Sequence, residues 1–158
     1  YKDYKDGNKK YGCDDGIEKF TSSGLDKNKI IIGAAYYGKA YTITGANRWE
    51  LYPGLGSMAT LTSLQYDSGT VTYSYIYNNI LTDKGFKRYY DPAACVPFLY
   101  NEATKIWITY EDEESLTEKV NFAYQEGVGI MFWEYGYDYK NILTETICRE
   151  MGKLRGNN

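Results

Sequence analysis

The residues that could perform acid–base chemistry in this chain are carboxylates, tyrosines and lysines, because it contains no histidine. Without histidine there is no Ser-His-Asp or Cys-His device, no imidazole base and no imidazole metal site. Two carboxyl groups held at a defined separation can still hydrolyse a glycosidic bond, with one of them donating the proton. The acidic candidates are Glu134, Asp138, Asp91 and the cluster at residues 111–114.

Most of these carboxylates also fit an ordinary role at the start of a helix. The cluster at residues 111–114 opens an expected helix, where the helix dipole favours negative charge, so we interpret it as a solvated helix start. Asp138 precedes the last expected helix and is interpreted as its N-cap. Glu134 follows a buried strand beside an aromatic residue. That position alone does not identify a catalytic residue, and we place Glu134 among the candidate ligand contacts.

Tyrosine is the unusual excess, with 19 copies beside three tryptophans. An aromatic ring offers an apolar face to the C–H side of a sugar, and tyrosine adds a hydroxyl group. Strands also favour tyrosine for packing. On composition alone both interpretations stay open.

Charge and cysteine content exclude several other classes. A net charge of -3 and a pI near 5.1 argue against a nucleic-acid partner, which would require a basic face. No apolar run approaches the roughly 20 residues of a membrane span, and residues 1–10 are too polar for a signal peptide. Cys13, Cys95 and Cys148 are odd in number and far apart, so we expect buried small hydrophobes rather than disulfides or a metal site. No cofactor is implied.

Two apolar segments are expected to form neighbouring parallel strands. Residues 29–38 are rich in β-branched side chains after a short helix at 14–23, as in a strand covered on both faces. Residues 128–133 are expected to form a second such strand. One helix is expected before it, at residues 112–126, and another after it, starting at Asp138. Alternation of strands and helices is typical of a βα-barrel or an open α/β sheet.

The stretch between the two strand segments, residues 41–111, is expected to be an α+β insertion. Glycine and proline punctuate residues 41–68, and Ser74 could cap a short helix. Short strands are expected at residues 70–73, 86–91, 96–100 and 105–110.

Ligand contacts are expected where the parallel strands end, because the loops there converge on one face. Tyr36, Tyr37 and Lys39 end the first segment, and Trp133 and Glu134 end the second. A tryptophan at a strand end is usually part of a core, so Trp133 lines a groove only if the segments belong to a barrel.

Several motifs resemble the last part of glycoside hydrolase family 18. KIIIGAAYYGK at residues 29–39 resembles the family's seventh-strand pattern, K-[LIV]-x-[LIV]-G-x-P-x-Y-G-R. YSYIYNNIL (73–81), YYDPAACVPFLY (89–100) and WITYEDEESLTEKV (107–120) resemble its α+β chitinase insertion domain. VGIMFWEYGYD at residues 128–138 resembles the eighth strand.

The resemblance implies an α/β plus α+β fold, the C-terminal fragment of a TIM (β/α)8 barrel with an inserted chitinase insertion domain. Residues 1–40 and 112–158 would be barrel remnants, and residues 41–111 the insertion domain. A whole barrel needs about 250 residues, and the chain has 158 and begins with Tyr1, which agrees with a fragment.

The resemblance also implies roles for single residues. Trp133 matches the tryptophan that stacks beneath the sugar about to be cleaved, and Tyr37 and Lys39 match the tyrosine and arginine that border the cleft. Lys39 keeps the charge but lacks the guanidinium fork, and Ala35 replaces the usual proline. The family's acid motif, D-x-x-D-x-D-x-E, and its M-x-Y-D motif do not occur in this sequence.

We therefore expect part of a chitinase acting on β-1,4-linked N-acetylglucosamine, inactive by itself and supplying cleft walls. Two alternatives stay open: a non-catalytic chitin-binding lectin module and an endo-β-N-acetylglucosaminidase fragment. By resemblance the partners are chitin or its oligosaccharides, and the whole protein is secreted or on the cell surface. Unpaired barrel strands should make the fragment associate with itself, or make the barrel remnants rearrange around an independently folded insertion domain.

Overall fold

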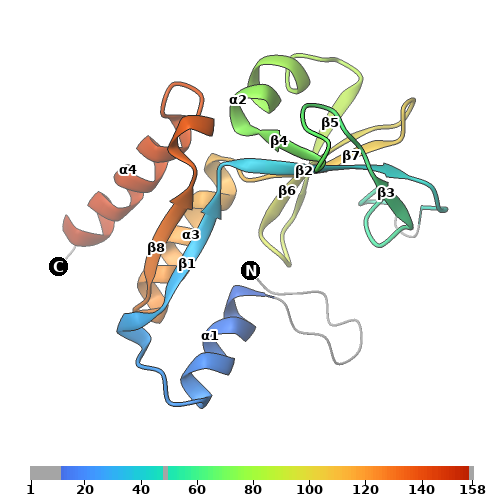
Figure 1. Ribbon diagram of the computed structural model, residues 1–158. Coiled ribbons are helices and arrows are strands. Elements are labelled where there is room, and N and C mark those ends of the chain that lie inside the picture. The colour runs from blue at the N-terminus through green and yellow to red at the C-terminus, as the bar shows by residue number, and fades with distance from the viewer. Residues whose placement is uncertain (1–11, 48–49, 157–158) are drawn as a thin grey trace.

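Two parallel strands run side by side at the centre of the computed structural model, which describes residues 12–47 and 50–156 (Figure 1). β1 (Ile31–Ala35) pairs with β8 (Gly129–Trp133) in an unbroken register from Ile31 opposite Gly129 to Ala35 opposite Trp133. The predicted parallel pairing of the two apolar segments is confirmed. Residues 1–10, judged too polar for a signal peptide, lie outside the described residues.

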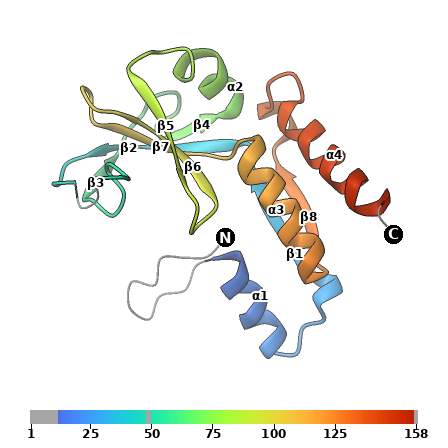
Figure 2. The same ribbon diagram turned by 180° about the vertical axis from the view of Figure 1, so that it is seen from behind.

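Helices cover one face of this strand pair, and the other face is open. Ile32 and Ala34 are buried against the helices, whereas Ile31, Met131 and Trp133 on the opposite face are 62%, 44% and 61% exposed. Figure 2 shows α3 (Glu113–Glu126) lying across the covered face, with α4 (Ile142–Gly156) beside it. The prediction that these strands are covered on both faces is therefore wrong within this chain, because no second layer of the described residues packs on the open face.

The ends of α3 lie where the sequence placed them, whereas α4 begins at Ile142, four residues after Asp138. The Asp112 side chain accepts hydrogen bonds from the backbone N–H of Glu114 and Ser115, and Gly127, with φ 69°, ends α3. Asp138 accepts from the backbone N–H of Leu143 and Thr144 at the start of α4, so its predicted capping role is confirmed. Shorter helices are α1 (Cys13–Ser22), η1 (Lys27–Lys29) and η3 (Tyr135–Tyr137).

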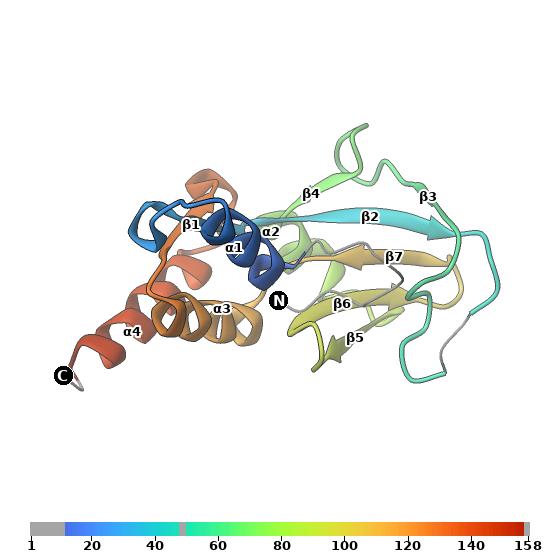
Figure 3. The same cartoon turned by 90° about the horizontal axis from the view of Figure 1, so that it is seen from below.

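A six-stranded antiparallel sheet extends from the upper end of β1 and β8 (Figure 1). Its strands lie in the order β3-β2-β7-β6-β5, with β4 also paired to β2. α2 (Tyr73–Tyr75) and η2 (Ile76–Ile80) cover one face through the buried Ile76 and Ile80 (Figure 3). The strands are β2 (Tyr37–Ile43), β3 (Ala59–Leu61), β4 (Thr70–Thr72), β5 (Phe86–Asp91), β6 (Val96–Asn101) and β7 (Ile106–Thr109).

The chain passes from one sheet to the other at Tyr36. The run predicted as one strand, residues 29–38, divides there into β1 and β2. The Tyr36 backbone N–H donates to the Trp133 carbonyl oxygen over 2.8 Å, and the Tyr36 carbonyl accepts from the Tyr73 N–H over 2.9 Å. We call residues 37–109 the insertion module and the remaining described elements the parallel unit. The six-stranded sheet thus starts before the division after residue 40 that the sequence suggested.

A buried ion pair lies between α3 and the segment that leaves the insertion module. The Lys119 ammonium pairs with the Glu111 carboxylate, and their side chains are only 8% and 9% exposed. Lys119 also donates to the Gly33 carbonyl oxygen in β1 over 3.1 Å, and the Ser115 hydroxyl donates to Glu111 over 2.7 Å. The interpretation of residues 111–114 as a solvated helix start is therefore wrong for Glu111, because the inward-facing Lys119 holds its carboxylate.

The structure bears on two features that composition raised, the state of the cysteines and the presence of membrane-spanning helices. The cysteines do not behave as buried hydrophobes: Cys13 and Cys95 are half-buried and Cys148 is exposed, and all three are free. In the part of the chain that the structure describes, no helix combines the length and apolarity needed to cross a membrane.

Replacing Lys119 by Met should lower the free energy of unfolding by about 3–5 kcal/mol, because the Glu111 carboxylate then stays buried without its counter-charge. Urea denaturation of the parent and variant measures this. The Lys119→Met/Glu111→Leu double variant should recover much of the loss. Lys27→Met, which breaks the exposed pair with Glu126, is the matched control and should cost less than about 1 kcal/mol. Equal losses for Lys119→Met and Lys27→Met would contradict the argument.

Candidate functional site

Trp133 forms an exposed aromatic platform at the C-terminal end of β8. Its side chain is 61% exposed on the open face of the strand pair, directly beside Ala35. A small neighbour leaves the indole ring accessible. An indole in this position can stack against a flat apolar surface of a ligand.

Tyr37 and Lys39 share one face of β2 because side chains alternate along a strand. Both are half-buried. The Lys39 ammonium donates to the Thr70 hydroxyl of β4 over 2.7 Å and to the Ser68 carbonyl in the preceding turn over 3.1 Å, so these two residues hold it in place. Since Tyr36 is hydrogen-bonded to the Trp133 backbone, Tyr37 starts β2 next to the end of β8.

Tyr36 belongs to the core, and its predicted ligand contact is wrong. Its side chain is 0% exposed and stacks on Phe132, with ring centroids 4.8 Å apart and planes within 1°. The Thr144 hydroxyl donates its single proton to Asp138 over 2.9 Å, so the Tyr36 hydroxyl donates to Thr144 over 3.2 Å. Burial raises the pKa of Tyr36 to about 12. Strand alternation turns Tyr36 inward when Tyr37 faces outward.

Glu134 is half-buried and directly follows the exposed Trp133. Its backbone carbonyl accepts from the Tyr137 N–H over 2.9 Å, which closes the short turn η3. A carboxylate here could accept hydrogen bonds from a ligand stacked on the indole. Its contact with a ligand stays a prediction.

The ion pair of Lys119 was missed by the sequence reasoning, although the sequence holds a signal for it. Ser115, Leu116, Val120 and Ala123 line the inward face of α3, and Lys119 lies on that same face. A lysine on an apolar helical face needs a buried counter-charge. Glu111 lies eight positions earlier, but only the fold shows that the carboxylate turns inward.

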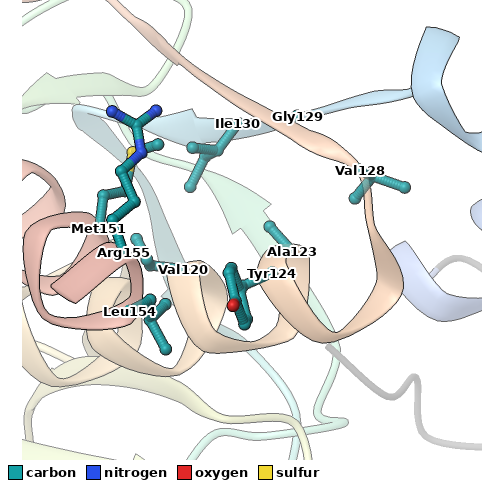
Figure 4. A pocket seen from close by; sticks show the side chains of 9 residues that line it. All are labelled: Val120, Ala123, Tyr124, Val128, Gly129, Ile130, Met151, Leu154 and Arg155. Carbon is teal, nitrogen blue, oxygen red and sulfur yellow. The ribbon is translucent and has the colours of Figure 1, made fainter. Parts of the chain in front are cut away.

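An apolar pocket lies on the covered side of the strand pair. Side chains of α3, β8 and α4 line it, among them Val120, Ile130 and Leu154 (Figure 4). Val128 and Gly129 place it at the N-terminal end of β8, the end opposite Trp133. Barrel enzymes bind ligands at the C-terminal ends of their strands. The pocket lies at the N-terminal end of β8, so it is separate from the Trp133 platform.

These features define a class: a βα unit with an α+β module inserted between parallel strands and an aromatic platform at the strand ends. The family profile described as "Glycosyl hydrolases family 18" matches residues 1–138. The chain belongs to this family. Its fold is the partial (β/α)8 barrel with an insertion that the resemblance implied.

The relatives found are chitinases. The chain is 27% identical to Chitinase A1 of Niallia circulans over 140 residues, which covers 86% of this chain and 19% of that protein. It is 33% identical to a class V chitinase of Lotus japonicus over 126 residues, covering 78% of this chain and 29% of that protein. The chain thus spans less than a third of the length of these two relatives.

Solved structures of the family superpose on most of the chain. A family 18 N-acetylglucosaminidase from Paenibacillus barengoltzii has a TM-score of 0.77 at 26% identity, covering 93% of this chain and 41% of that one. A class V chitinase from Nicotiana tobaccum in complex with NAG4 has a TM-score of 0.76 at 25% identity, covering 88% of this chain and 39% of that one.

The raised pKa of Tyr36 predicts an alkaline loss of stability. The unfolded chain releases this phenol proton near pH 10, whereas the folded chain keeps it to about pH 12. Between these values the folded state binds more protons, so the free energy of unfolding falls as the pH rises. Tyr36→Phe keeps the ring and should lose less stability than the parent in denaturant titrations from pH 9 to 12. Tyr124→Phe, whose ring is 47% exposed, should follow the parent. A Tyr36→Phe curve parallel to the parent's would contradict this assignment.

Proposed function

We propose that this chain is part of a chitinase-type glycoside hydrolase that acts on polymers or oligomers of β-1,4-linked N-acetylglucosamine. The exposed Trp133 at the C-terminal end of β8 carries the proposal. Its indole can stack beneath a sugar ring, whose C–H groups present an apolar face. The bound NAG4 of the tobacco relative supports an N-acetylglucosamine oligomer as the ligand.

Tyr37 and Lys39 form the neighbouring wall of the proposed cleft. Tyr37 begins β2 where β8 ends and supplies a hydroxyl group to this wall. Lys39 is held by Thr70 and Ser68 and presents a single cationic group, which favours one hydrogen bond to a sugar oxygen over a forked contact. Glu134 adds an acceptor beside the platform.

This chain is proposed to bind the sugar chain without cutting it. The acid motif D-x-x-D-x-D-x-E does not occur in its sequence. Family 18 enzymes are an exception to the two-carboxylate scheme, since the substrate assists its own cleavage, so the proton donor is the group that must come from elsewhere in the whole protein. The open face of β1 and β8 further supports self-association of the isolated chain.

Trp133→Ala should weaken binding of an N-acetylglucosamine tetramer about 5- to 150-fold, because it removes a stacking contact worth about 1–3 kcal/mol. Isothermal titration calorimetry measures the affinity, and Trp133→Phe should retain part of it. Tyr124→Ala removes another exposed ring, from α3, and is the matched control with parent affinity. Equal affinities of Trp133→Ala and the parent would refute the platform.

The purified 158-residue chain should release no sugar from a chitin oligomer, whereas the whole protein that contains it should release products. A reducing-end assay with mass spectrometry of the products measures both. Sugar release by the chain alone would show that it carries its own acid. Binding without cleavage by the whole protein would favour the lectin alternative.

A further inference from the structure

The polypeptide joins the insertion module to the parallel unit at two crossings. One crossing is Tyr36, between β1 and β2, and the other is the stretch between Thr109 of β7 and Glu113 of α3. Buried side chains of both units also share one core, in which Ile76 lies with Leu116 and Leu143, so the motion left to the module is a small tilt about the line through the two crossings. Contacts away from that line are therefore the ones that oppose a tilt of the module.

An aromatic stack lies away from both crossings. Tyr77 of η2 stacks on Tyr139, in the loop between β8 and α4, with ring centroids 4.6 Å apart and an interplanar angle of 26°. One turn earlier, the Ser74 hydroxyl donates to the Tyr137 carbonyl oxygen over 2.9 Å. In Figure 1 this helical turn and this loop face each other above the end of β8. These contacts connect the module to the loop that follows Trp133.

The loop is built to present Tyr139. Lys140 and Asn141, which follow it, both have a positive φ, 52° and 61°. Two consecutive non-glycine residues in this region are costly and persist only where surrounding contacts hold them. The Lys140 ammonium lies 5.1 Å from the centroid of the Tyr139 ring, on the ring face.

A second set of contacts offers less resistance to a tilt. Arg88 of β5 pairs with Asp112 and Glu114, each over 2.7 Å. Asp112 lies at one of the two crossings, so its pair with Arg88 is close to the axis of the tilt and opposes the tilt only weakly. The side chains of Arg88 and Glu114 are 36% and 55% exposed, so salt screens their attraction.

We propose that Tyr77 and Tyr139 are positioning residues whose stack sets the angle of the insertion module against β8. This angle determines the position of Tyr37 and Lys39 relative to the Trp133 platform. Neither ring belongs to that platform or wall, so both act at a distance. The effect on sugar affinity rests on the proposed function, whereas the effect on the angle does not.

The native cysteines allow a direct test of the angle. Cys95 lies between β5 and β6 in the module and Cys148 lies in α4, so spin labels on both report the distance between the two units once Cys13→Ser removes the third thiol. Pulsed electron paramagnetic resonance should give one narrow distance distribution for the parent. Tyr77→Ala should broaden or shift it, and Tyr77→Phe should restore it because the stack needs only the ring.

Tyr139→Ala, from the opposite side of the stack, should reproduce the effect, and the double variant should add nothing further. Tyr124→Ala is the control and should keep the parent distribution. Circular dichroism identifies the folded variants, and at least one of the two alanine variants should qualify because Tyr77 is 37% exposed. In a folded variant, tetramer affinity should fall about fivefold, within the usual range of coupling between sites.

An unchanged distribution in a folded Tyr77→Ala or Tyr139→Ala variant would overturn the proposal. A changed distribution with parent affinity would overturn the link between the angle and the cleft. Failure of the parent itself to bind the tetramer would count against the proposed function alone, because the distance measurement needs no ligand.

Discussion

The parallel pairing of β1 with β8 is the constraint on which the rest of this structure depends. Its register places Ala35 opposite Trp133, and the ladder continues through the hydrogen bond from the Tyr36 N–H to the Trp133 carbonyl. The chain then turns into β2. An aromatic platform from one end of the sequence and the first residues of the insertion module are thereby held together by backbone hydrogen bonds, which do not depend on side-chain identity.

Two polar networks lie at the junction of the two units, beside an apolar core to which both units contribute. Lys119 joins the Gly33 carbonyl of β1 to Glu111 at the exit from the module, and Tyr36, Thr144 and Asp138 form a second, partly buried chain of hydrogen bonds. Buried charges are costly to desolvate, so an apolar junction of the same shape could be equally stable. What the polar groups add is geometry: each hydrogen bond is satisfied in one arrangement of the strand, the exit segment and the helix.

The chemistry of the site follows from what this junction displays. One open strand face carries an exposed indole, and the adjacent strand carries a tyrosine and a tethered lysine. The proposed sugar contact uses these groups. The chain belongs to glycoside hydrolase family 18, and its fold is a partial barrel of that family.

Local pattern in the sequence determined much of this protein. The β-branched runs predicted the two parallel strands, Asp138 and Gly127 marked helix ends, and the motifs around Tyr37 and Trp133 indicated the family and the platform. Tertiary structure decided the rest. Whether Tyr36 faces core or cleft depends on where the strand bends, and whether Glu111 meets water or Lys119 depends on how α3 packs on β1. Both are relations between segments distant in sequence, which residue type and local period do not encode.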